Sequence, residues 1–329
     1  MAATIALLTA MIGVLLVAFA WPSVRASLHD VPIVVAGQPD AVERVVSALE
    51  QHQPGAYVVT RVESTAAAET AVRDRQAYGA IDVTTGTPRV IVASGASAVV
   101  GQALQASASG LLQASGSAGA AHLALLDVAP LPADDPRGAG LAAGSLPLVI
   151  GGILAAFLLA RMVRGLLQRV VGAVGFAVTG ALALGAILQF WFGSLGGDYW
   201  ANSGAIGLSI AATSLFILGL QSVIGSTGFA IGAALMMLVG NPLAGTSSAP
   251  EMLPGWLGNV GQLLPPSASG WLLRSTAFFD GHGAWPHAAV LLLWLAAGCV
   301  LCIVGAVRGA RADKPVPAPT AIPELDPAR

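Results

Sequence analysis

The chain has 329 residues, of which 55% are hydrophobic and only 10% are charged. Soluble domains carry about 25% charged residues, so this composition excludes an ordinary soluble enzyme and predicts an integral membrane protein. The net charge is −2 and no basic stripe is present, so nothing indicates a nucleic-acid partner.

The chain begins with an uncharged apolar run over residues 2–20. This run is long enough for a membrane-spanning helix, which needs about 20 residues. A signal peptide is the alternative, because Ala18-Phe19-Ala20 resembles a cleavage site. The missing positive n-region and the long apolar core favour an uncleaved anchor over residues 1–22.

Charged residues return between positions 23 and 140, which predicts a water-facing α/β domain ending in a Pro/Asp-rich tether over 127–140. Alternating or short apolar runs predict four strands, and apolar residues at helical spacing predict three helices. Their expected order is β-α-β-α-β-β-α, with a hairpin turn at 85–88. The expected strands are 32–37, 56–62, 79–84 and 89–93, and the expected helices are 40–52, 65–76 and 97–115.

The remaining chain is a membrane domain over 141–307, followed by a Pro-rich tail over 308–329 that we expect to be disordered. Five further apolar runs bring the expected number of transmembrane helices to six. These runs are 141–160, 170–192, 203–220, 228–240 and 287–307. The predicted fold is therefore an α-helical polytopic membrane protein with an α/β domain inserted between spans one and two.

Two basic clusters closely flank these spans. They consist of Arg161, Arg164 and Arg169, and of Arg308, Arg311 and Lys314. The positive-inside rule makes them topology anchors in the cytoplasm, although Arg161 and Arg164 could also contact a cytoplasmic partner. Six spans then place both termini in the cytoplasm and residues 23–140 outside the plasma membrane. Six tryptophans fall on the outer side, as an aromatic belt requires: Trp21, Trp191, Trp200, Trp256, Trp271 and Trp285.

A polar, Gly/Pro-rich stretch separates the last two spans, and we expect it to form a re-entrant outer loop over 241–285. Irregular backbone survives at membrane depth only where protein or a water-filled cavity covers it, so such a loop is typical of a substrate route or gate. The pair Pro265-Pro266 is expected to end the excursion. The candidate gate residues are Asn241, Pro242, Glu251, Pro254, Gln262, Pro265, Pro266 and Arg274.

Two charges in this stretch have open interpretations. An acid inside a membrane is a functional candidate by default, so Glu251 is either a functional group or a solvated loop residue. Arg274 could pair with Glu251 or Asp280, or extend along apolar surface to the interface.

No residue set in the sequence indicates catalysis, a cofactor or a metal site. A G-x-x-x-x-G-K-[ST] loop is missing, so any use of ATP must come from a separate subunit. The five histidines are scattered without metal-ligand spacing. Cys299 and Cys302 lie in the last apolar run, where we interpret them as small packing residues.

Several short motifs occur in a familiar order along nearly the whole chain. They are Ala77-Tyr78-Gly79-Ala80-Ile81, Asp134-Asp135-Pro136-Arg137-Gly138, Asn241-Pro242-Leu243-Ala244-Gly245, Pro250-Glu251-Met252-Leu253-Pro254, Leu264-Pro265-Pro266, Leu272-Leu273-Arg274-Ser275 and Phe278-Phe279-Asp280-Gly281. In motif order and span layout the chain resembles the permease subunits of type-2 ABC exporters, and more closely the YhgE/Pip-like (phage-infection-protein-like) membrane proteins.

This resemblance implies half of a homodimeric or heterodimeric exporter that works with a separate ATPase subunit on a hydrophobic or lipid-like compound. The alternative is a non-transporting membrane scaffold or cell-surface receptor that uses its extracytoplasmic domain for binding. That alternative is motivated by the water-facing domain at 23–140.

Overall fold

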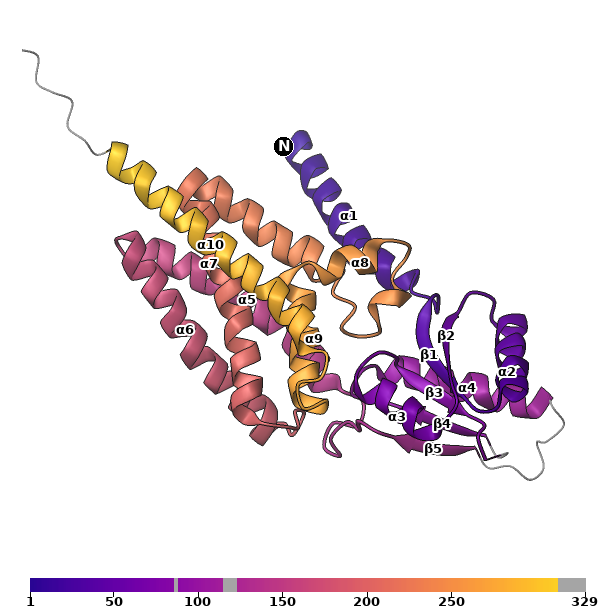
Figure 1. Cartoon of the computed structure of the whole chain (residues 1–329). Coiled ribbons are helices and arrows are strands. Elements are labelled where there is room, and N and C mark those ends of the chain that lie inside the picture. Colours follow the sequence, from indigo (N-terminus) through magenta and orange to yellow (C-terminus); the bar gives the residue numbers. More distant parts are fainter. Residues whose placement is uncertain (86–87, 115–122, 313–329) are drawn as a thin grey trace, which may run out of the picture.

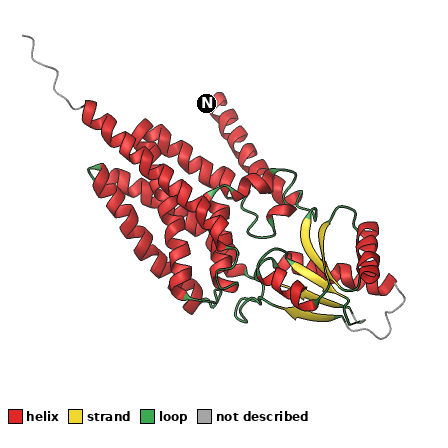
Figure 2. Ribbon diagram, viewed as in Figure 1, coloured by secondary structure: helices red, strands yellow, loops and turns green. Residues whose placement is uncertain are grey.

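The computed structural model describes residues 1–85, 88–114 and 123–312, and it consists of a bundle of long helices beside a small mixed sheet (Figures 1 and 2). The expected disorder of the tail beyond residue 312, including Lys314, lies outside the described residues. The centre of the expected hairpin turn, at 86–87, also lies outside them.

The sheet has five strands in the order β2-β1-β3-β4-β5. β1 pairs in parallel with β2 and β3, β3 pairs antiparallel with β4, and β4 pairs in parallel with β5. The strands are β1 (Val31–Ala36), β2 (Tyr57–Val62), β3 (Gly79–Asp82), β4 (Arg89–Val92) and β5 (Ala124–Asp127). We call the part of the chain from β1 to β5 the α/β region.

Apolar side chains cover both faces of this sheet. Alternate residues of β1 divide between the faces, with Ile33 in one buried cluster and Val34 in the other, as the period of two requires. The first cluster includes residues of α2 and α4, and the second includes residues of α3. These helices are α2 (Pro39–His52), α3 (Thr65–Arg73) and α4 (Ala98–Ala114).

The sequence predicted four of the five strands and all three helices of the α/β region within a few residues. The Ser64 hydroxyl caps α3 by accepting a hydrogen bond from the Ala67 backbone N–H at 3.2 Å. The fifth strand, β5, was missed, and Asp127 ends that strand rather than beginning a tether. Its sequence, ALLD, is too short to display an alternating pattern, and the strand pairs in parallel with β4 at the end of the sheet.

Within the described residues, five helical segments are long and apolar enough to cross a membrane. Their length and composition are those of a multi-pass membrane protein. They are Ala2–Pro22, Ala139–Met162, Leu166–Trp191, Tyr199–Gly240 and Ala284–Ala310. The helices that contain them are α1 (Ala2–Val24), α5 (Ala139–Met162), α6 (Leu166–Ala186), α7 (Tyr199–Ala234) and α10 (Ala284–Ala312). Short π-helical turns, Ile187–Trp191 and Leu235–Gly240, extend α6 and α7.

The 42-residue segment Tyr199–Gly240 is not one straight helix. Ile224 and Gly225 have non-helical backbone angles, and Gly225 has a φ of +68°, a conformation that glycine adopts without strain. Beyond this break the chain turns back on itself, because Gly232 lies against Ile217. The two arms correspond to the fourth and fifth expected spans, and the count of six separate crossings remains a prediction.

A segment over residues 241–283 connects α7 to α10, and we call it the connecting segment. It contains a 3-10 turn (Pro250–Met252), α8 (Leu257–Gln262) and α9 (Pro265–Phe278). Pro265-Pro266, expected to end the excursion, occupies the first two positions of α9, a helix that was not predicted. Proline suits the first helical position, where its fixed φ fits and no N–H is needed.

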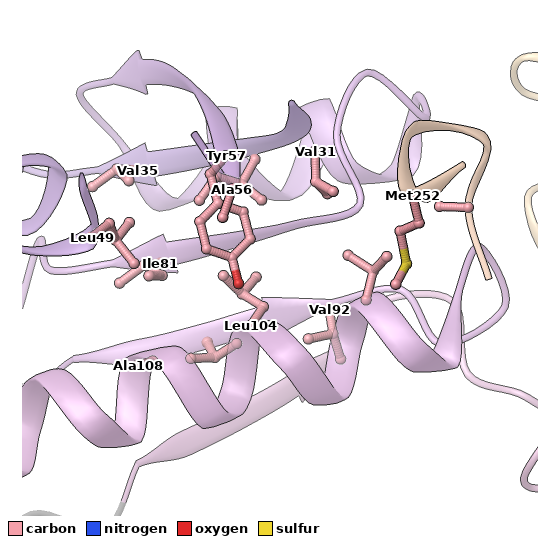
Figure 3. Packing of buried hydrophobic residues seen from close by; sticks show 14 of the residues in the cluster. Val31, Val35, Leu49, Ala56, Tyr57, Ile81, Val92, Leu104, Ala108 and Met252 are labelled. Carbon is pink, nitrogen blue, oxygen red and sulfur yellow. The ribbon is translucent and has the colours of Figure 1, made fainter. Parts of the chain in front are cut away.

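The connecting segment is packed against both parts of the molecule. Ala249 and Met252 complete the buried cluster on one face of the sheet, and Phe279 lies in the cluster on the other face. Figure 3 shows Met252 among residues of the sheet, with Val92 nearby. Leu272 and Leu273 of α9 are buried in the helical bundle. The segment is therefore a packed element between the bundle and the α/β region.

Candidate functional site

The candidate site lies where the connecting segment meets the α/β region and the start of α10. Nearly every residue of α9 is buried, which is unusual for a segment with this many polar groups. Trp271 is only 2% exposed, and its indole N–H donates to the Ala244 backbone oxygen at 3.3 Å. Ser267 donates to the same oxygen at 2.9 Å. These hydrogen bonds fix α9 against the turn that follows α7.

Glu251 contacts the α/β region directly. Its Oε2 accepts a hydrogen bond from the Tyr78 hydroxyl at 2.8 Å. Tyr78 lies just before β3, 173 residues earlier in the chain. Glu251 is half-buried, so it is neither immersed in apolar protein nor a fully solvated loop residue.

Arg75 is the second connection between the two parts. It follows α3 with a φ of +59°, which directs the chain from the helix toward β3. Its Nη1 donates to the Trp271 backbone oxygen at 3.0 Å and to the Ser275 hydroxyl. Its guanidinium also lies 5.1 Å from the ring centroids of both Trp271 and Phe279, within the range of a cation–π contact.

Arg274 adopts neither of the arrangements expected from the sequence. It is 8% exposed, so it does not extend to the membrane interface, and it forms no ion pair with Glu251 or Asp280. Its position in the middle of the buried helix α9 directs the side chain inward. There Nη2 donates to the Thr246 oxygen at 2.6 Å, while Nε and Nη1 have no partner among the described residues.

A cavity of about 450 Å³ lies at this junction. That volume is within the usual range for small-molecule sites. The α/β region contributes Arg75 and Tyr78, the connecting segment contributes Glu251 and Trp271, and α10 contributes His287. The carboxylate of Asp74 and the amides of Asn259 and Gln262, on α8, also line the cavity. Gln262 donates to Ser267 at 2.5 Å.

Burial has a clear electrostatic effect on the groups from the α/β region. Desolvation lowers the pKa of Arg75 to about 10, although the negative charge of Glu251 partly opposes this shift. Burial, followed by the charge of Glu251 and the hydrogen bond to it, raises the pKa of Tyr78 well above its ordinary value. At neutral pH Arg75 is therefore a cation, and Tyr78 is a neutral phenol that donates to Glu251.

The structure brings together only part of the residue set predicted from the sequence. Glu251 and Gln262 line the cavity, and Arg274 lies beside its Trp271 wall. Pro265 and Pro266 are buried at the start of α9, where they support the wall. Asn241, Pro242 and Pro254 lie elsewhere on the connecting segment and do not line the cavity.

Sequence reasoning missed Arg75, Tyr78, Trp271 and His287 as members of the site. Arg75 and Trp271 are 196 residues apart, and no periodicity reports a contact of that separation. The available signal was Trp271, a tryptophan within a Gly/Pro-rich stretch. The aromatic-belt prediction instead places this residue at the membrane interface. The other five tryptophans of that belt are exposed: Trp21, Trp191, Trp200, Trp256 and Trp285.

The site suits ligand binding through charge, hydrogen bonds and an aromatic wall. No group of three or more metal-ligating side chains occurs in the part of the chain that the structure describes. No protein-family model matches the chain, and no curated protein or solved structure matches it either.

Proposed function

We propose that this protein is a permease-like membrane subunit of the type-2 ABC exporter kind, which moves a hydrophobic or lipid-like compound together with a separate ATPase subunit. The observation that carries the proposal is the connecting segment. It folds back against the bundle and the α/β region and lines a cavity between them. A segment that contacts both parts could transmit a change in one to the other.

The proposed topology has six crossings, with both termini in the cytoplasm and the α/β region outside. The break at Gly225 supports six crossings, because it separates two antiparallel arms. The basic clusters support the orientation. Leu159 and Leu166, which flank the α5–α6 turn, pack in one cluster with Cys302 near the end of α10. Figure 1 shows the end of α10 far from the α/β region. Arg161, Arg164, Arg169, Arg308 and Arg311 therefore belong to one end of the bundle.

A separate ATPase would have to bind at this basic end. Arg161 and Arg164 are exposed there, whereas Arg169 donates to the Val163 oxygen at 2.9 Å and stabilises the turn. A partner with an acidic surface would gain charge-assisted contacts with the two exposed arginines. Assembly as a homodimer or heterodimer is part of the same proposal.

The test is to purify the full chain from its native membranes and identify the proteins that remain bound. An ATP-hydrolysing subunit should be recovered in stoichiometric amounts, and inside-out vesicles should move fluorescent lipid analogues only when ATP is present. Replacing Arg161 and Arg164 together with alanine should reduce recovery of the subunit. Arg44→Ala, at an exposed position on α2, serves as the matched control. Recovery of the chain alone, with no ATP-dependent movement, contradicts the proposal.

The second candidate function is a membrane receptor or scaffold. It is favoured by the position of the cavity, which lies beside the α/β region rather than between the long helices of the bundle. A receptor would bind its ligand there and pass the signal through α9 and α10 without moving the ligand. Ligand binding by the full chain without an ATPase partner or transport would support this function over the first.

A further inference from the structure

One cation and two carboxylates line the cavity, because Asp74 lines it as well as Arg75 and Glu251. Burial lowers the pKa of Arg75 and the charge of Glu251 raises it, yet no ion pair joins Arg75 to Glu251 among the described residues. Buried charges in proteins are normally paired, because a lone charge in low dielectric is costly. This arrangement leaves room for a ligand between them.

Each charge also keeps unused hydrogen-bonding capacity. Both hydrogen bonds of Arg75 come from Nη1, so Nε and Nη2 remain available among the described contacts. Glu251 accepts from Tyr78 through Oε2, which leaves Oε1 free of described partners. A guanidinium prefers an anionic oxygen group, and a carboxylate oxygen prefers an N–H donor.

The field of the site orients such a ligand. Arg274 adds a second buried cation, and its guanidinium carbon lies 5.1 Å from the Trp271 centroid, as does that of Arg75. Two of its nitrogens are buried without a partner. Two guanidinium cations thus lie against the Trp271 ring, whereas Glu251 is contacted by Tyr78, which stays a neutral donor.

The surroundings of the cavity indicate an amphiphile. Asn259 and Gln262 of α8 line the cavity, and Leu263, directly after α8, is 61% exposed. Trp256 and Trp285 are exposed directly before α8 and at the start of α10. Tryptophans at the ends of apolar helices mark the head-group level of a bilayer. Because Pro286 and His287 line the cavity directly after Trp285, we expect the cavity to lie near that level in the bilayer.

We propose that the cavity binds the zwitterionic head group of an amphiphile, with its anionic group at Arg75 and its ammonium group at Glu251. This inference rests on the proposed function, since the bound amphiphile is the compound to be moved. Binding itself, however, needs no ATPase. A zwitterion offers an opposite charge to both Arg75 and Glu251, which neither a simple anion nor a simple cation can do.

The test measures lipid binding to the purified full chain in nanodiscs, without any partner subunit. Phosphatidylethanolamine, phosphatidylglycerol and phosphatidylcholine with identical acyl chains are compared by native mass spectrometry. We expect phosphatidylethanolamine to bind about tenfold more tightly than either other lipid. That factor corresponds to one ammonium–carboxylate hydrogen bond. Phosphatidylglycerol offers Glu251 only neutral hydroxyl donors, and the quaternary ammonium of phosphatidylcholine has no N–H. Equal binding of phosphatidylglycerol and phosphatidylethanolamine overturns the proposal.

Glu251→Gln tests the ammonium side of the cavity. Glutamine keeps the size of the side chain and still accepts from Tyr78, so the variant should fold normally and lose the preference for phosphatidylethanolamine. Glu43→Gln, on the exposed face of α2, is the control and should keep that preference. A preference that survives in Glu251→Gln refutes the assignment. If this variant aggregates, the comparison of the three lipids still decides.

Free O-phosphoethanolamine distinguishes a lipid from a soluble source of the same chemistry. Competition with the lipid shows that the head group alone is recognised. If O-phosphoethanolamine binds to the protein and no lipid does, the cavity belongs to a soluble zwitterion, and the proposal of a bound amphiphile is overturned. If the chain selects phosphatidylethanolamine but no ATPase co-purifies with it, this inference stands and the transport proposal fails. If transport depends on ATP but the chain does not select phosphatidylethanolamine, the transport proposal stands and this inference fails.

Discussion

Asp82, the last residue of β3, is a buried carboxylate with several hydrogen-bond partners, whereas Arg75 and Glu251 in the cavity have few. Asp82 is 1% exposed and accepts from Arg89 at 2.9 Å and from Thr65 at 2.7 Å. Thr84 donates to it through both its hydroxyl and its backbone N–H. Burial alone would raise the pKa of Asp82, but these hydrogen bonds outweigh that effect and hold the pKa below its ordinary value.

Asp82→Asn should therefore destabilise the α/β region by about 2–4 kcal/mol, because it leaves Arg89 without its buried partner. Since the folded-state pKa is the lower one, the carboxylate stabilises the protein above about pH 4, and this stabilisation is lost as the pH falls through the folded-state pKa. Hydrogen exchange of the β3 and β4 amides measures both effects. Asp30→Asn, at an exposed position, should leave exchange unchanged. Equal protection in Asp82→Asn and wild type would show that the network has no stabilising role.

At the scale of elements, sequence reasoning succeeded where a hydrophobic period was long enough to read. Helix α2 displays Val42 and Leu49 on one buried face, and the long apolar helices were recognised from length alone. The prediction failed for β5 and α9. The burial of α9 on all sides gives no amphipathic period, and its initial prolines resemble a stop signal. Tertiary packing, rather than local propensity, forms these two elements.

Glycines allow the long helices to approach each other closely. A Cβ at Gly298, on α10, would lie 2.6 Å from the Leu215 carbonyl carbon and the Phe216 nitrogen of α7. These are backbone atoms, so they cannot move aside without separating the helices. In lipid, where apolar burial gives little drive for association, close backbone approach is a main source of helix packing.

Gly298→Ala should thus weaken the packing of α7 on α10, with a loss of about 1–3 kcal/mol, as expected for overpacking. The measurement is thermal unfolding of the purified chain in one detergent. Gly309→Ala on the same helix is the matched control, because a Cβ there meets nothing within 4 Å. The control should be neutral or slightly stabilising, since alanine favours a helix over glycine. A Gly298→Ala protein as stable as the control would exclude this close packing.

At the scale of the whole molecule, the sequence predicted one half of the candidate site. Glu251 and Gln262 were identified because polar residues stood out in an apolar part of the chain. Their partners were not, because Arg75 and Tyr78 look like ordinary residues of a water-facing region. Only the folded chain brings Tyr78 within 2.8 Å of Glu251, across 173 residues. The junction between the two parts could not be read from either part alone.

The number and direction of the membrane crossings can be tested in the full chain by labelling single cysteines with an impermeant maleimide. Cys299 and Cys302 are first replaced by serine and alanine. Cysteines are then introduced at three exposed positions, Ser47, Gln168 and Ser226. If α7 and its π-helical extension form two crossings that meet near Gly225, Ser226→Cys and Gln168→Cys should react only after the membrane is permeabilised. Ser47→Cys should react in intact cells, because the positive-inside rule places the basic clusters in the cytoplasm.

Each result has a distinct structural meaning. The arm after the break has 15 residues, from 226 to 240, so it spans only about 22 Å as an α-helix, less than the roughly 30 Å hydrocarbon core. It can form a crossing only if the connecting segment completes it with buried polar backbone, as α9 and its neighbouring turn would do. Labelling of Ser226→Cys from outside, with Gln168→Cys protected, would show that the break does not lie at the cytoplasmic face, so neither arm would cross and the count would fall to four. Reaction of Gln168→Cys in intact cells, with Ser47→Cys protected, would reverse the orientation and place the cavity at the cytoplasmic leaflet.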